Sequence, residues 1–119
     1  MIGDPALHAD PALAYGNAVV WKPASTVPLL AMRLAQALTQ AGLPAGVLGL
    51  LVGGTDVGDA IVGHPGIDAL TFTGSTGVGR RIAAAAAARG IPAQAEMGGK
   101  NAAVVLDDAD LDLAVDLVM

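Results

Sequence analysis

The apolar residues of this sequence fall into short continuous runs, separated by stretches in which Leu and Ala recur at helical spacing. Continuous apolar runs of this length, bounded by Gly and Pro, are typical of buried strands. They predict strands at residues 18–22, 47–52, 68–72, 93–96 and 102–107. The helical spacing predicts helices from Pro28 up to Gly42, over about 57–63 and 76–89, and after residue 110.

Strands and helices therefore alternate along the chain, with short links between them. The predicted strands are apolar throughout rather than apolar at every second position. This is typical of a parallel sheet that is covered on both faces. The pattern predicts an α/β fold, a doubly wound parallel sheet or part of one, with right-handed crossovers.

Polar residues and glycines at the predicted helix ends indicate how each helix is closed. Ser25 or Thr26 is expected to cap the first helix, and Asp56 the second. Gly90 is expected to close the third helix as its C-cap. The acidic cluster Asp107, Asp108 and Asp110 could suggest a cation site, but a helix N-cap explains it better, because the helix dipole favours negative charge there.

The composition excludes several classes of function. The sequence has 119 residues, a net charge of −5 and three aromatic residues, which argues against a nucleic-acid or anionic membrane surface. It has no cysteine, and His8 and His64 have no second metal ligand at useful spacing, so we expect no metal site. No apolar run is long enough to span a bilayer and no secretory signal is present, so we expect a soluble cytoplasmic protein.

The most informative junction is GSTGVG, residues 74–79, which follows a predicted strand and opens a predicted helix. Glycines permit close backbone approach, and the free N–H groups of a helix start favour an anion such as a pyrophosphate. The spacing matches neither the usual dinucleotide fingerprint nor a Walker loop. On the spacing alone, a tight turn with Ser75 as the helix cap is the simpler explanation of the same residues.

Two charged residues stand beside apolar segments. Lys22 ends the first predicted strand, where it could reach a phosphate or a ribose hydroxyl, or simply be a solvated charge. Glu96 lies among Ala, Met and Gly in AEMGGK. Partial desolvation there would raise its pKa toward that of a general base, whereas the alternative is an exposed loop carboxylate.

Four stretches together resemble the aldehyde dehydrogenase superfamily. They are PALAYGNAVVWKPAS, AGLPAGVLGLLVG, GHPGIDALTFTGSTGVGRRIA and EMGGKNAAVVLDDADLDLAV, in the order and spacing of that family. The resemblance covers residues 11–119 and implies part of a Rossmann-like cofactor-binding domain, while residues 1–10 do not resemble it. AYGN and EMGGKN are similar to the branch of 2-oxoglutarate semialdehyde (2,5-dioxopentanoate) dehydrogenases.

The resemblance implies roles for seven residues of this chain. Glu96 would be the general base, and Gly98 belongs to the loop that follows it. The cofactor NAD or NADP would be held by Lys22 and Ser25 at the adenosine ribose, Gly54 near the adenine, and Gly74 and Ser75 at the pyrophosphate. Ser25 would not repel a 2′-phosphate, as a glutamate there would, so NADP use is plausible.

The resemblance also implies what these residues lack. The nucleophilic cysteine of the family lies beyond the position of Glu96, and this sequence ends at Met119 without one. The full-length parent would be a homo-oligomer that oxidises an aldehyde to a carboxylate. Because thiohemiacetal chemistry needs the thiolate, we expect this chain alone to be catalytically silent. The alternatives are a dinucleotide-binding module without catalysis and a non-functional remnant.

Overall fold

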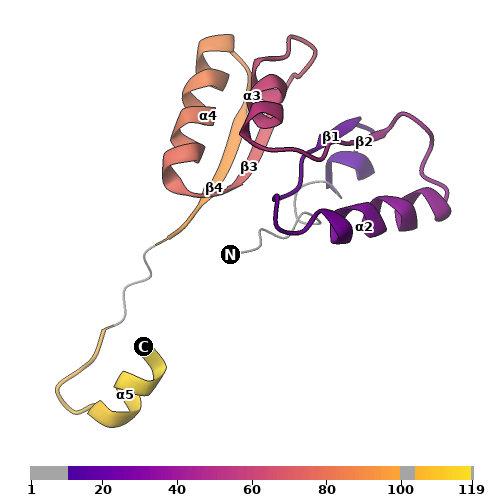
Figure 1. The fold of residues 1–119 in the computed structure, drawn as a ribbon. Coiled ribbons are helices and arrows are strands. Elements are labelled where there is room, and N and C mark those ends of the chain that lie inside the picture. The colour runs from indigo at the N-terminus through magenta and orange to yellow at the C-terminus, as the bar shows by residue number, and fades with distance from the viewer. Residues whose placement is uncertain (1–10, 100–103, 119) are drawn as a thin grey trace.

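The computed structural model describes residues 11–99 and 104–118 (Figure 1). Strands and helices alternate along these residues, as the sequence predicts. The elements are β1 (Val19–Trp21), α2 (Pro28–Gln40), β2 (Leu48–Leu50), α3 (Thr55–Gly63), β3 (Leu70–Gly74), α4 (Thr76–Arg89), β4 (Ala93–Met97) and α5 (Leu111–Val118).

The strands form two parallel pairs. β1 pairs with β2, with Val19 opposite Leu48, and β3 pairs with β4, with Leu70 opposite Ala93. The parallel α/β class is therefore confirmed, but the described strands form two separate two-stranded sheets rather than one continuous sheet. Hydrogen bonds continue just past the short β1–β2 ladder, where the amide of Leu51 donates to the carbonyl of Trp21 at 2.9 Å. Pro23 then ends the first strand, because it has no N–H to donate.

The predicted strand at 102–107 is not found in the part that the structure describes. Residues 104–106 have no strand pairing, and residues 102 and 103 lie outside the described residues. The apolar pattern was a misleading signal here, because a strand requires a neighbour whose backbone completes its hydrogen bonds. The segment instead leads into α5, away from both sheets (Figure 1).

The helix ends confirm two of the predicted caps and correct two others. Gly90 closes α4 in the left-handed conformation (φ 68°), and Asp110 Oδ1 accepts hydrogen bonds from the amides of Asp112 and Leu113. The N-cap of α2 is Val27 rather than Ser25 or Thr26, because Pro28 fixes the first helical position. Gly54 is the N-cap of α3, which places Asp56 inside its first turn rather than at the cap.

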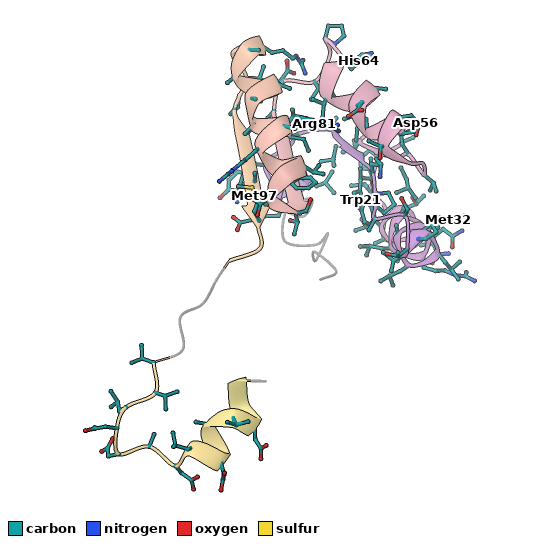
Figure 2. The ribbon with its side chains drawn as sticks, turned by 60° about the vertical axis from the view of Figure 1, so that its left-hand side comes forward. Trp21, Met32, Asp56, His64, Arg81 and Met97 are labelled. Carbon is teal, nitrogen blue, oxygen red and sulfur yellow. The ribbon has the colours of Figure 1, made fainter. Side chains whose placement is uncertain are left out.

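Helix α4 packs closely on the β3–β4 sheet through small residues. Gly79 and Ala86 are the buried residues of α4. A Cβ atom at Gly79 would lie 2.6 Å from Sδ of Met97 and 3.4 Å from Cδ1 of Phe72. Figure 2 shows Met97 on the sheet beside this helix. The absence of a side chain at Gly79 therefore sets the distance between helix and sheet.

We predict that Gly79→Leu destabilises this packing by about 2 kcal/mol, because the added carbons occupy space held by Met97 and Phe72. Urea denaturation of the purified chain would measure the change. Leucine favours helices more than glycine does, so propensity alone would raise stability. A stability equal to or above that of the original chain would therefore contradict the packing argument. The matched control is Gly77→Leu on the same helix, where an added Cβ meets nothing within 4 Å.

Helix α3 is attached to α4 through two arginines of α4. Arg89 donates from Nη1 to the carbonyl of Val62 at 2.5 Å and from Nη2 to the carbonyls of His64 and Ile67, both at 2.7 Å. Arg81 forms an exposed ion pair with Asp59 at 2.8 Å, and Figure 2 shows it between the two helices. Arg89 thus holds the carboxyl end of α3 and the link that follows it, and Arg81 contacts the middle of the helix at Asp59.

The apolar core of the described residues is small. Ala31 and Ala86 are its buried hydrophobic residues, whereas large apolar side chains such as Leu29, Leu30 and Leu111 are at least 60% exposed. No helix among the described residues is long and apolar enough to cross a membrane. The high apolar content of the sequence therefore appears largely at the surface of this structure.

Candidate functional site

The carboxyl ends of β1 and β2 bring together the first group of predicted site residues. The hydroxyl of Ser25 donates to the carbonyl of Gly53 at 3.5 Å, which joins the link after β1 to the link after β2. Lys22 is partly buried, and its Nζ donates to the carbonyl of Pro23 at 3.1 Å. Gly54, the N-cap of α3, is exposed at the same edge. In parallel α/β sheets, ligands bind outside this edge.

The β3–α4 junction has an open helix start. Ser75 occupies the predicted N-cap position, but its hydroxyl makes no capping hydrogen bond, and its side chain is exposed. The first intrahelical bond is donated by the amide of Gly79 to the carbonyl of Ser75. The amides of Thr76, Gly77 and Val78 precede it and have no acceptor within the helix. Free amides at a helix start are the groups that bind anions at such positions in proteins.

Gly74 precedes this helix start and lies under the ring of Phe72. A Cβ atom at Gly74 would be 2.6 Å from Cζ of that ring. The ring of Phe72 thus covers Gly74, whereas the helix side of the junction is open at Gly77, where an added Cβ would meet nothing within 4 Å. The sequence predicted this open backbone, and the unused Ser75 hydroxyl favours a ligand over a simple capped turn.

Glu96 lies on β4, in register with Thr73 of β3. Its side chain is exposed, and Oε1 accepts a hydrogen bond from Nε2 of Gln94 at 3.3 Å. Of the two alternatives that the sequence left open, the structure shows the exposed carboxylate, on a strand rather than in a loop, and not the partial burial among Ala, Met and Gly. Its neighbours Gln94 and Met97 are themselves exposed, because within the described residues β4 pairs on one edge only. Gly98 follows and is exposed as well.

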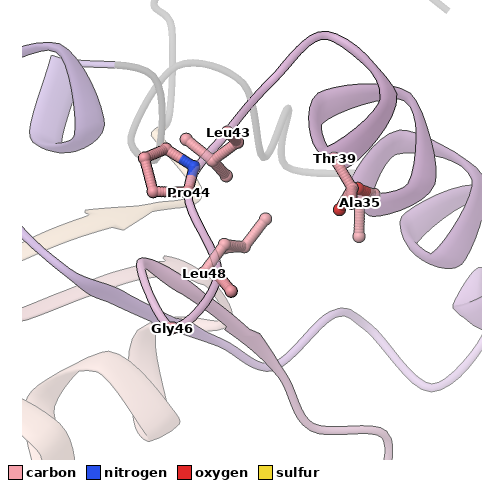
Figure 3. Close-up of a pocket in the computed structure, with 7 residues that line it drawn as sticks. Ala35, Thr39, Leu43, Pro44, Gly46 and Leu48 are labelled. Carbon is pink, nitrogen blue, oxygen red and sulfur yellow. The ribbon is translucent and has the colours of Figure 1, made fainter.

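A small cavity of about 190 Å³ lies at the opposite edge of the β1–β2 sheet (Figure 3). It is lined by apolar and small residues at the end of α2 and the start of β2, namely Ala35, Thr39, Leu43, Pro44, Ala45, Gly46 and Leu48. It has no charged lining residue, and it faces the amino end of β2. None of the predicted site residues lines this cavity, so it is not part of their site.

No group of three or more potential metal ligands occurs among the described residues. The nitrogen Nδ1 of His64 instead accepts a hydrogen bond from the amide of Gly66, as expected for a turn.

Two residues beside the predicted site were not predicted as site residues. Gly58 lies beside the stem of Lys22, and Gln94 donates a hydrogen bond to Glu96. Gly58 had a signal, since it ends the glycine-rich segment 53–58, whereas Gln94 had none.

Comparison with known proteins shows the family of this chain. The profile of the aldehyde dehydrogenase family matches residues 4–119. The chain is 48% identical over 110 residues to betaine aldehyde dehydrogenase 2 of Rhizobium meliloti, covering 92% of this chain and 23% of that protein. It is 49% identical over 110 residues to alpha-ketoglutaric semialdehyde dehydrogenase of Bacillus subtilis, covering 92% of this chain and 22% of that protein.

Solved structures show the same fold. An aldehyde dehydrogenase of Mycobacterium tuberculosis complexed with NAD⁺ matches with a TM-score of 0.81 and 46% identity, over 88% of this chain and 22% of that chain. The methylmalonate-semialdehyde dehydrogenase of Oceanimonas doudoroffii matches with a TM-score of 0.85 and 38% identity, over 94% and 23%. The chain thus spans less than a quarter of the length of these relatives. By its sequence and its fold, this chain belongs to the aldehyde dehydrogenase family.

Proposed function

We propose that these residues form the cofactor-binding part of an NAD(P)-dependent aldehyde dehydrogenase, an oxidoreductase that converts an aldehyde to a carboxylate. The observation that carries this proposal is the open start of α4, where exposed Ser75 leaves the first amides of the helix without a cap. Such a helix start suits a pyrophosphate, because the amides and the helix dipole favour negative charge.

The residues at the strand ends fit a dinucleotide. Gly74 and Ser75 would hold the pyrophosphate, Gly54 would lie near the adenine, and Lys22 and Ser25 would contact the adenosine ribose. Ser25 is neutral and exposed, so it presents no negative charge to a 2′-phosphate. We therefore propose that the site accepts NADP as well as NAD. Bound there, the nicotinamide supplies the hydride acceptor for aldehyde oxidation.

Glu96 would act as the general base. Its exposed carboxylate can accept a proton from a nucleophile or from a water molecule, and Gly98 belongs to the loop beside it. The sequence has no cysteine, so in this proposal the thiolate comes from outside these 119 residues. The polypeptide by itself is then a nucleotide-binding unit that does not turn over an aldehyde.

The proposed substrate is 2-oxoglutarate semialdehyde. The motifs AYGN and EMGGKN support this choice, as does the similarity to the Bacillus subtilis enzyme that acts on this semialdehyde. The similarity to betaine aldehyde dehydrogenase 2 is of the same size, which makes betaine aldehyde the comparison substrate. Assays with both aldehydes would separate the two in a polypeptide that also supplies the thiolate, which these 119 residues lack.

Replacing Ser75 by Asp tests the pyrophosphate site. We expect the affinity for NAD and NADP to fall by about tenfold or more, because a carboxylate at the N-cap occupies the amides and repels the phosphates. Isothermal titration of the purified chain would measure both affinities. Ser75→Ala is the matched control and should stay within about threefold of the original chain, since the backbone amides are unchanged.

AMP provides a further comparison, because it has no pyrophosphate bridge and should lose less affinity than NAD. Equal NAD affinity in the Ser75→Asp variant would exclude the proposed phosphate site. Failure of the original chain to bind any of the three nucleotides would exclude the proposed nucleotide-binding function of this polypeptide.

A further inference from the structure

The aliphatic part of the Lys22 side chain lies against Gly58 of α3. A Cβ atom placed on Gly58 would be 3.7 Å from both Cδ and Cε of Lys22, which is ordinary van der Waals distance. Both residues are partly buried. The first turns of α3 therefore form a surface on which the lysine stem rests, and a methyl group at Gly58 would still fit there.

The two residues meet because β1 and β2 are parallel and in register. Trp21 lies opposite Leu50, so the residue after β1 and the link after β2 leave the sheet at the same edge. The hydrogen bond from Ser25 to Gly53 joins these two links a second time. Lys22 and Gly58 are far apart in the sequence, and the strand register together with the start of α3 brings them together.

At the far end of the Lys22 side chain, the ammonium group is held by a hydrogen bond. An ammonium has three N–H donors, and within residues 11–99 and 104–118 its hydrogen bond goes to the carbonyl of Pro23 at 3.1 Å. Pro23 is buried, so this acceptor is fixed. The stem against Gly58 and the bond to Pro23 together restrain a side chain that is otherwise rich in rotamers.

We propose that Gly58 is a positioning residue for Lys22. A residue no larger than alanine at position 58 leaves space for the lysine stem, which holds the ammonium at the ligand-binding edge of the β1–β2 sheet before the nucleotide arrives. Restraining a flexible side chain in advance lowers the ordering cost of binding. This inference rests on the proposed function, because the adenosine ribose is the ligand assigned to Lys22.

The test is a double-mutant cycle in the 119-residue chain, with NAD affinity measured by isothermal titration. Lys22→Met should weaken NAD binding about tenfold through loss of a charge-assisted hydrogen bond. Gly58→Leu should weaken it by a similar factor, because the larger side chain displaces the stem. In the Lys22→Met background, Gly58→Leu should change the affinity by less than about twofold, because the residue that it displaces is already absent.

Gly58→Ala is the matched control. Its methyl group fits at 3.7 Å from the stem, so NAD affinity should stay within about twofold of the original chain. Alanine and leucine both favour helices more than glycine does, so neither variant should lower the melting temperature through helix propensity. A loss of affinity in Gly58→Leu at unchanged melting temperature then separates positioning from a merely structural role.

A second measurement needs no ligand. Lys22 and Lys100 are the lysines of the sequence, so lysine labelled at Cε gives a simple NMR spectrum that Lys22→Met assigns. Gly58→Leu should move the Lys22 signal toward that of a freely rotating lysine, and Gly58→Ala should leave it in place.

The outcomes separate the inference from the proposed function. If the original chain binds NAD and Gly58→Leu changes neither the affinity nor the Lys22 signal, the positioning role is overturned and the proposed function stands. If the original chain binds neither NAD nor AMP, the proposed function fails and the inference fails with it. Loss of affinity in Gly58→Leu that persists in full without Lys22 would also overturn the inference, because the effect would not act through the lysine.

Discussion

Replacing Glu96 by Gln is expected to lower aldehyde oxidation by about 100-fold to 10,000-fold, the usual contribution of a general base. The neutral amide keeps the shape of the side chain but cannot take the proton. The measurement requires a chain that also contains a thiolate. The matching 110 residues of the Bacillus subtilis relative can be replaced by those of this chain, and NAD(P)H formation can then be followed with the semialdehyde.

The controls for this experiment come from the same strand. Glu96→Asp retains a carboxylate and should keep more activity than Glu96→Gln. NAD affinity should be unchanged in Glu96→Gln, because in the proposed site this carboxylate serves the acyl chemistry rather than the cofactor. Turnover within about threefold of the parent chimera would exclude Glu96 as the general base. A parent chimera that binds NAD and oxidises no aldehyde would exclude the proposed catalytic role of this segment.

Arg89→Met is expected to destabilise the fold by about 3 kcal/mol, because one guanidinium donates to three backbone carbonyls that then lose their partner. Two of these bonds are partly buried, where an unmade hydrogen bond costs more than at the surface. Methionine keeps most of the aliphatic volume, so the loss is mainly one of hydrogen bonds. Urea denaturation with and without NAD would measure it.

Two other arginines of α4 provide matched controls. Arg80 is exposed, and Arg81 makes an exposed ion pair with Asp59. Arg80→Met and Arg81→Met should change stability by less than about 1 kcal/mol, as is usual for exposed charges. Arg89→Lys keeps the charge but loses the planar set of donors, so it should restore less than half of the loss. Equal stability of Arg89→Met and Arg80→Met would contradict the role given to Arg89.

The contacts of Arg89 also matter for the site. They fix the carboxyl end of α3 to α4, and the starts of these two helices are Gly54 and Ser75, which we assign to the adenine and to the pyrophosphate of the dinucleotide. We therefore expect Arg89→Met to weaken NAD binding more than AMP binding, because NAD must span both helix starts. The comparison therefore tests whether the contacts of Arg89 at one end of the two helices affect nucleotide binding at the other end.

Local patterns in the sequence predicted most of the secondary structure. Leu and Ala at helical spacing gave α2, and the Ala-rich stretch before Gly90 gave α4 with its C-cap, because helix formation depends on residues three and four positions apart. The predicted strand at 102–107 is not found at residues 104–107, because a strand depends on residues far away in the sequence and not only on near neighbours. An apolar run is compatible with a strand, but whether it becomes one depends on a neighbouring strand from elsewhere in the fold.

For the site, the sequence by itself determined which chemistry is available. It places Lys22 at the end of a predicted strand and Ser25, Gly54, Gly74 and Ser75 within three residues after one, and in parallel sheets these positions share one edge. It also contains the motifs that resemble those of the aldehyde dehydrogenase family, to which the chain belongs. These features are encoded in short segments, so they can be read without knowledge of the fold.

Only the tertiary structure decided which residues meet across the chain. The register of β1 with β2 brings the stem of Lys22 onto Gly58, and the packing of α4 beside α3 brings Arg89 onto the carbonyls of Val62 and Ile67. It also left Glu96 exposed, although its sequence neighbours are mostly apolar. Sequence periodicity reports on neighbours within a few residues, whereas these contacts depend on how separate strands and helices pack. They therefore became visible only in the folded chain.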